Sequence, residues 1–262
     1  MKAHVYSLEG KKGREIALPR VFDTAYNPEV ISRAVIATQT HRLQRKGSNV
    51  RAGFDTSAEY IGRRAAFRSG INRGIARLPH IKTGGGGTGR VMRVPQARGG
   101  HRSHPPRVEK VIYKEINKKE YIAAIRSAIA ATANAKLVTA RGHRIEAVEM
   151  PLVVEDAAQK ISKTKDALAL LNNIGLGSDL ARGKVKTVRA GQSTMRGNKY
   201  RRKRSVLVVV ADGGKAFRNL PGVDVATVSG LSIEQLAPGA TAGRLTVYTE
   251  ASIKQLGEKY GN

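Results

Sequence analysis

The sequence predicts an α/β fold: a three-layer-like globular body with a mainly parallel sheet flanked by helices, and a long extended loop within it. Three observations favour this fold. Valine-rich apolar runs, typical of strands buried on both faces, alternate with helical segments. The alternation stops between residues 45 and 107 and then resumes. Positive charge is concentrated in that interval and in one later segment, whereas the rest of the chain is nearly balanced.

The first expected elements are a β-hairpin and a helix. The runs HVYSL and REIAL flank the turn EGKKG, which is typical of a hairpin. Asn27 is a suitable N-cap, and Pro28 suits the first helical position that follows it. Apolar residues then recur with helical spacing, so the helix is expected to reach about Leu43.

Residues 45–107 are expected to form one extended, basic, glycine-rich insertion. They contain twelve glycines and four prolines, and their apolar residues are isolated. A connection of this length is uncommon in a compact domain and is usually functional or disordered. Short helical pieces are expected within it, for example in AEYIGRRAAFR, residues 58–68. The body is then formed by residues 1–44 and 108–262.

Helices and strands alternate after the insertion. KEYIAAIRSAIAATAN indicates an amphipathic helix, and SKTKDALALLNNIGLG indicates another, capped by Ser162 and stopped at Gly175 or Gly177. The expected strands are PLVVED, SVLVVVAD, VDVATV and RLTVYT, and EASIKQLGEKYG is expected as the last helix. Strands that alternate with helices predict a parallel sheet.

The formal net charge of +27 is concentrated in two segments. Arg42–Arg107 has fifteen Lys or Arg and two acids, and Arg182–Arg204 has ten and none. Such segregated charge favours a polyanionic partner, either nucleic acid or an anionic membrane surface. The chain has no cysteine, which excludes disulfides and thiolate metal sites, and its N-terminus lacks a signal-peptide apolar stretch. A cytoplasmic location is therefore expected.

The stretch HIKTGGGGTGRVMRVPQARGGHRSHPPR contains the spacing G-x-G-x-x-G at Gly84, Gly86 and Gly89. A dinucleotide site needs a strand before this motif and a helix after it. Pro79 is expected to interrupt the strand and Pro95 the helix, and no GK[ST] follows, so nucleotide binding is disfavoured. A flexible linker is the second interpretation. Arginines every few residues favour a third one, a strand that threads through folded RNA and becomes ordered when bound.

Two other kinds of site are weighed against the same residues. His101 and His104 could be metal ligands, but no cysteine or nearby acid completes a site, and contact with phosphate or base edges is favoured. Asp212 and Asp224 have no convergent histidine, so a catalytic role is disfavoured. They are expected to be a turn acid at a strand end and a surface acid.

The second basic segment, RGKVKTVRAGQSTMRGNKYRRKRS, directly precedes the apolar run SVLVVV. Because the segment is internal and adjoins a buried strand, the body holds it in a fixed place. RNA contact is therefore favoured over a solvated loop, and Tyr200 could stack on a base or sugar.

Long motifs of this chain resemble one known family. RVPQARGGHRSHPPR, MRGNKYRRKRS and RNLPGVDVATVSGLSIEQLAPGATAGRLTVYTEASIKQL are similar to the large-subunit ribosomal protein four family, in its archaeal and eukaryotic branch. The resemblance extends over essentially the whole chain. It implies an early-assembling structural protein of the large subunit, with no catalytic activity, cofactor, metal, membrane contact or homo-oligomer. The implied partners are large-subunit ribosomal RNA, neighbouring proteins including the twenty-two family, and the nascent polypeptide.

The resemblance also implies roles for particular residues. Ser69–Lys82 corresponds to a loop tip in the peptide exit tunnel, with Arg73, Arg77, Pro79 and His80 at the turn. The RNA-binding residues of the loop are expected to be Arg42, Arg45, Lys46, Arg51, Arg63, Arg64, Arg68, Lys82, Arg90, Arg93, Arg98, His101, Arg102, His104 and Arg107. Those of the body are expected to be Lys184, Lys186, Arg189, Arg196, Lys199, Tyr200, Arg201, Arg202, Lys203 and Arg204. Gln192, Ser193 and Thr194 stand where the family is expected to have a lysine-bearing stretch, so phosphate contact is not carried over to them.

Two other classes of function remain open at this point. One is an RNA-binding protein outside the ribosome, which the absence of a recognisable reading module disfavours. The other is a nucleotide-using enzyme, which a parallel sheet permits but does not by itself support.

Overall fold

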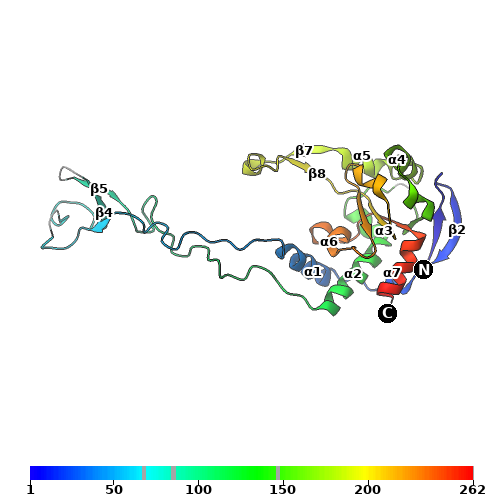
Figure 1. The fold of residues 1–262 in the computed structure, drawn as a ribbon, viewed down its shortest axis with the longest axis horizontal. Helices are drawn as coiled ribbons and strands as arrows, with labels where there is room; N and C mark the ends of the chain where they lie inside the picture. Colours follow the sequence, from blue (N-terminus) through cyan, green and yellow to red (C-terminus); the bar gives the residue numbers. More distant parts are fainter. Residues whose placement is uncertain (67–68, 84–86, 146–147, 262) are drawn as a thin grey trace. The chain divides into compact units, whose positions relative to one another are not determined.

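The computed structural model describes residues 1–66, 69–83, 87–145 and 148–261 (Figure 1). The chain divides into two compact units. One contains Met1–Arg42 and Tyr113–Asn262 and is called the body, and the other, Leu43–Ile112, is called the inserted unit.

The body is built on a six-stranded, mainly parallel sheet, as predicted. Its strand order is β10-β9-β11-β6-β1-β2. Every neighbouring pair is parallel except β1 and β2, which form the predicted antiparallel N-terminal hairpin. The strands are β1 (Lys2–Tyr6), β2 (Lys12–Ala17), β6 (Leu152–Val154), β9 (Leu207–Val210), β10 (Asp224–Thr227) and β11 (Thr246–Thr249).

Helices cover both faces of this sheet. Alternate residues of a strand point to opposite faces, so Leu207 and Val209 of β9 pack on one side, and Val208 and Val210 pack on the other. The first side is covered by α1 (Pro28–Thr40), α2 (Lys118–Thr132), α6 (Ile233–Leu236) and α7 (Glu250–Tyr260). The second is covered by α4 (Thr164–Asn173), α5 (Gly177–Lys184) and the 3-10 helix η5 (Lys215–Asn219), with α3 (Ala135–Ala140) contributing Val138.

The helix termini test the cap predictions. Asn27 accepts a hydrogen bond from the Val30 amide at 3.3 Å, and α1 begins at Pro28 as expected. The predicted Ser162 cap is wrong, because α4 begins at Thr164 and its N-cap residue makes no side-chain cap bond. Of the two glycine stops, Gly175 follows α4 with φ of +94°, whereas Gly177 begins α5.

The helix α1 ends at Thr40, before the expected limit of Leu43. Side chains of the body join the two chain ends that flank the inserted unit. The Lys114 amide donates to Thr40 Oγ1 at 2.9 Å, and the rings of His41 and Tyr113 stack with centroids 5.7 Å apart. The chain therefore leaves and rejoins the body at one place.

The inserted unit contains a small antiparallel sheet, β3-β4-β5, formed by Glu59–Tyr60, Pro79–Lys82 and Thr88–Val91. Two expectations are corrected here. A strand at Glu59–Tyr60 stands where a helical piece was expected, and Pro79 begins a strand instead of interrupting one. Proline is compatible with the first residue of a strand because only its missing N–H is lost to the ladder. The Pro79 carbonyl still accepts from the Met92 amide at 3.0 Å.

Candidate nucleic-acid interface

The body presents its basic segment as a β-hairpin, residues 182–204, which is called the basic hairpin. It contains β7 (Lys186–Val188) and β8 (Tyr200–Arg202), paired antiparallel with Lys186 opposite Arg202. Every residue of both strands is exposed. An isolated two-stranded hairpin is marginally stable in water, so the features that hold this one in place decide whether its cations form a fixed surface.

Contacts within the basic hairpin extend the strand pairing toward its turn. The Arg189 amide donates to the Lys199 carbonyl at 2.9 Å, and Arg189 Nε donates to the Tyr200 carbonyl at 3.2 Å. Lys186 Nζ lies 3.5 Å from the centroid of the Tyr200 ring. This ammonium group already contacts the ring that was expected to stack on a base or sugar.

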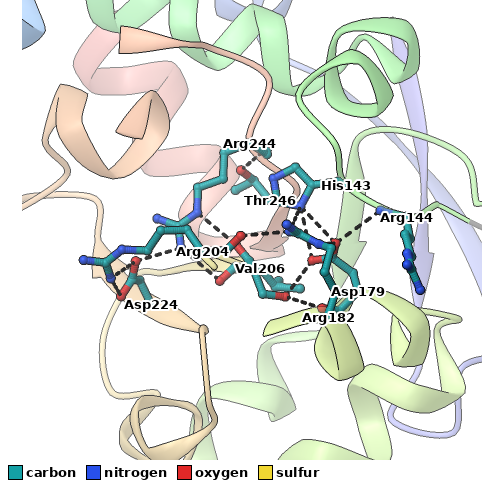
Figure 2. Close-up of polar contacts among 10 residues, drawn as sticks. His143, Arg144, Asp179, Arg182, Arg204, Val206, Asp224, Arg244 and Thr246 are labelled. Carbon is teal, nitrogen blue, oxygen red and sulfur yellow. Dashed lines mark hydrogen bonds and ion pairs between the residues drawn. The ribbon is translucent and has the colours of Figure 1, made fainter. Parts of the chain in front are cut away.

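A buried carboxylate fixes both ends of the basic hairpin (Figure 2). Asp179 of α5 is fully buried and accepts hydrogen bonds from Arg182 Nε at 2.8 Å and from Ser205 Oγ at 2.6 Å. Arg182 Nη2 also donates to the Arg204 carbonyl at 2.8 Å. Arg182 begins the basic hairpin and Arg204 ends it, so one guanidinium group bridges its two limbs.

The same carboxylate contacts His143 Nδ1 at 3.1 Å and accepts from the Arg144 amide at 3.2 Å. Burial by itself raises the pKa of Asp179, but the hydrogen bonds from His143, Arg182 and Ser205 outweigh it and hold the pKa below the ordinary 3.8. Burial lowers the pKa of His143 below 6.5, although Asp179 opposes this shift. At neutral pH the carboxylate is therefore charged and the imidazole is neutral.

A second buried cluster adjoins the first and is centred on Arg244, whose side chain is fully buried (Figure 2). Its Nε donates to the Ser205 carbonyl at 3.0 Å, and its Nη2 donates to Asp224 Oδ2 at 2.7 Å. Asp224 also accepts from Arg204 Nη1 at 2.7 and 2.8 Å. The expectation that Asp224 is a simple surface acid is therefore wrong. Asp212 does hold a turn after β9, because its Oδ1 accepts from the Gly213 amide at 2.8 Å.

Close backbone approaches in the inserted unit explain two of its glycines. Gly53 has φ of +84°, and a Cβ there would lie 2.4 Å from the Cα of His101. A Cβ on Gly100 would lie 1.8 Å from the Val94 carbonyl oxygen. The ring of His101 stacks on Phe54 with centroids 4.4 Å apart, and its Nδ1 contacts the Arg93 carbonyl. These glycines allow one part of the chain to pack directly on another.

His80 was expected at the turn of the tunnel tip, and its ring makes contacts within the inserted unit. It is buried in the small sheet, with Nδ1 2.8 Å from the Gly89 carbonyl oxygen and Nε2 3.1 Å from that of Ala76. Its ring therefore connects β4 to the neighbouring segments. Arg73 and Arg77 are exposed, and Pro79 is half-buried.

Nearly all the predicted RNA-binding residues that the structure describes are exposed. His101 is half-buried, and Arg68 lies outside the described residues. Gly84 and Gly86 of the G-x-G-x-x-G spacing also lie outside the described residues. Some of the exposed cations already have partners in the protein: Arg42 pairs with Glu234, Lys82 pairs with Glu59, and Arg93 Nη1 donates to the Ala58 carbonyl at 3.2 Å.

Two kinds of feature are absent from the described part of the chain. No group of three His, Asp or Glu side chains there could hold a metal ion. No helix in residues 1–66, 69–83, 87–145 or 148–261 has the length and apolar content needed to cross a membrane.

Comparison with known proteins identifies the family. The model of the ribosomal protein L4/L1 family matches residues 16–259. The chain belongs to this family. Relatives named large ribosomal subunit protein uL4 are 47% identical in Methanocaldococcus jannaschii, over 99% of this chain and 100% of the relative, and 46% identical in Methanococcus vannielii, over the same shares. The protein of that name from Methanoculleus marisnigri is 47% identical over 98% of this chain and 99% of its own length.

For this L4/L1 family member, sequence reasoning located the cations but missed the residues that anchor them. Asp179 and Arg244 were not singled out, and neither was Arg218, an exposed arginine of η5. A signal was present for Arg244, because a charged residue directly before the apolar run LTVY needs buried partners. No comparable signal pointed to Asp179.

Proposed function

We propose that this chain is a structural, non-enzymatic constituent of the large ribosomal subunit that binds its ribosomal RNA. One observation supports this most directly: a member of the ribosomal protein L4/L1 family presents exposed cations on two segments that contain almost no acids. Arginine and lysine on such surfaces bind phosphates, and the release of counterions from RNA contributes to affinity. Location in the cytoplasm, in the large subunit, follows from the same proposal.

The two basic segments contribute to RNA binding in different ways. The basic hairpin is anchored through Asp179 and Arg244, so its cations are held in place before RNA arrives. Such pre-organisation lowers the ordering cost of binding. The extended loop, residues 45–107, has few apolar contacts to offset its ordering entropy, about 1–2 kcal/mol per residue for the backbone. We propose that RNA completes the ordering of this loop during early assembly.

The turn of the loop, Ser69–Lys82, is proposed to line the peptide exit tunnel beside a protein of the twenty-two family and to face the nascent polypeptide. Each limb has about 33 residues and could extend roughly 100 Å at most, long enough to cross a layer of RNA. Arg73 and Arg77 are exposed and could contact either RNA or the passing peptide. The buried ring of His80 supports the shape of the turn instead.

Two double variants test this division of roles. Arg98→Ala with Arg102→Ala removes two exposed loop cations, for which no partner within the described chain is found, and it should reduce incorporation into large subunits. Arg73→Ala with Arg77→Ala should leave incorporation near wild type but change the response of translating ribosomes to a stalling peptide. Arg93 is not chosen for substitution, because its side chain also donates to the Ala58 carbonyl and its loss would disturb the loop itself.

The measurements are sucrose-gradient sedimentation of tagged variants and translation of a stalling reporter. If the Arg73 and Arg77 variant failed to enter subunits while the Arg98 and Arg102 variant assembled normally, the proposed roles of turn and limb would be wrong. A wild-type chain that never sedimented with large subunits would contradict the proposed function itself.

A further inference from the structure

Two adjoining cavities on the body form a trough beside the base of the basic hairpin. The first has a volume of about 620 Å³ and is lined by the end of α1, by β10 and by α6. The second, of about 570 Å³, is lined by β8, by residues 203–204 and by η5. Both are lined by Arg204, Arg218, Val223 and Asp224, so these residues form the common wall. The two cavities together are called the body trough.

The body trough has an excess of positive charge. Its two acids already have cationic partners: Glu234 pairs with Arg42, and Asp224 pairs with Arg204 and Arg244. Arg218, Arg202 and Lys203 also line the trough, and within the described residues none of them pairs with an acid. An exposed concave surface with unpaired cations attracts a polyanion.

The shape of the body trough favours an unpaired strand over a duplex. Each cavity has the volume of a small-ligand site, which a splayed nucleotide could enter and a double helix could not. Gln39 lines the first cavity and is exposed, and its amide offers both a donor and an acceptor to a base edge. Arg218 lies at the common wall, where a strand that passes from one cavity to the other would place its backbone.

We propose that the body trough binds an unpaired RNA strand, with Arg218 holding a phosphate at the common wall and Gln39 contacting a base. This inference rests on the proposed function and specifies the kind of RNA that this part of the body recognises. Arginine suits the role because its fork binds a phosphate through two hydrogen bonds.

The first test uses the full chain and a fluorescent single-stranded RNA of roughly eight nucleotides, with the matching duplex for comparison. Arg218→Ala should weaken single-strand binding by about tenfold, the effect of one charge-assisted phosphate contact, and duplex binding by less than about twofold. Arg218→Lys should restore part of the affinity. The matched control is Lys215→Ala, which removes an exposed cation from the same 3-10 helix but lines neither cavity.

Several outcomes would overturn the proposal. If Arg218→Ala weakened single-strand and duplex binding equally, Arg218 would contribute only general positive charge. If single-strand affinity were unchanged in this variant, Arg218 would not be part of the interface. In either case the proposed function would stand as long as the variant entered large subunits. A wild-type chain that bound neither RNA would contradict the proposed function instead.

A second test identifies the occupant inside purified large subunits. Asn219 lines the second cavity and is exposed, so a photo-crosslinking amino acid can replace it. A covalent product with ribosomal RNA, mapped to an unpaired segment, supports the proposal. A product with a protein would overturn it and indicate an acidic protein segment as the partner. A product with paired RNA would also overturn it.

Discussion

Replacing Asp179 by alanine should destabilise the body strongly. Its carboxylate is fully buried and accepts from Arg182, Ser205 and the Arg144 amide, with His143 at 3.1 Å. Alanine would leave the guanidinium of Arg182, which is only 13% exposed, without its counterion. Removal of one partner of a buried ion pair costs about 3–5 kcal/mol, a large part of the 5–15 kcal/mol that stabilises a typical domain.

The assay is urea unfolding followed by far-UV circular dichroism, with the free energy of unfolding extrapolated to water. Asp212→Ala is the matched control, because within the described residues the carboxylate of that exposed acid bonds only the adjacent Gly213 amide, and its loss should cost less than about 1 kcal/mol. The loss of unfolding free energy in Asp179→Asn should lie between the losses in Asp179→Ala and Asp212→Ala, since the amide keeps the volume and some of the hydrogen bonds but not the charge.

The anchor also has a local consequence. In Asp179→Asn, hydrogen exchange of the Arg189 amide, which bonds the Lys199 carbonyl, should be faster than in the wild type. A free-energy loss below about 1 kcal/mol in Asp179→Ala, with unchanged exchange at Arg189, would refute the idea that this carboxylate anchors the basic hairpin.

Two further predictions concern charge. If about 8–10 cations of the two basic segments contact phosphates, a plot of the logarithm of RNA affinity against the logarithm of salt concentration should have a slope of about −6 to −9. Deletion of residues 45–107 should flatten that slope, while circular dichroism should still show a folded body. An unfolded deletion variant would contradict the proposed domain boundary. The pKa of His143 in the folded state lies below 6.5, so the unfolded state binds a proton first as the pH falls, and urea unfolding should show stability decreasing from pH 7 to pH 5. His143→Gln should remove that part of the decrease, and an identical decrease in the variant would exclude His143 as its source.

The central strands β6, β9 and β11 could be predicted from sequence because they are buried on both faces. The run SVLVVV has no polar interruption, and no amphipathic helix would have that pattern. The short strands of the inserted unit could not be predicted. Glu59–Tyr60 is a strand only because it pairs with Pro79 and His80, and such pairing depends on contacts distant in sequence. The Ser162 cap failed for a smaller reason, because α4 begins at Thr164, one residue later than a cap at Ser162 requires.

The basic surface was predictable in its charge but not in its support. The segment Arg182–Arg204 has ten cations and no acid, which is visible in the sequence. In the structure these side chains are exposed, apart from the partly buried Arg182. The partners that hold this segment lie far along the chain: Arg244 contacts Ser205 and Asp224, and Asp179 contacts His143. Single-sequence patterns describe local periodicity, so they do not show which buried acid meets which arginine.

Thr40 and Lys114, the body residues that flank the inserted unit, are joined by a hydrogen bond. The inserted unit is therefore comparable to a cassette, a segment that can be exchanged without changing the body. The hydrogen bond between Lys114 and Thr40 and the stack of His41 on Tyr113 hold the two flanking segments together within the body. The packing of the sheet therefore does not depend on the length of chain inserted between these segments. Loop-closure entropy increases only logarithmically with length, by about 0.6 kcal/mol for each doubling. Descendants of such a protein can lengthen, shorten or replace the cassette as the surrounding RNA changes, with little effect on the stability of the body.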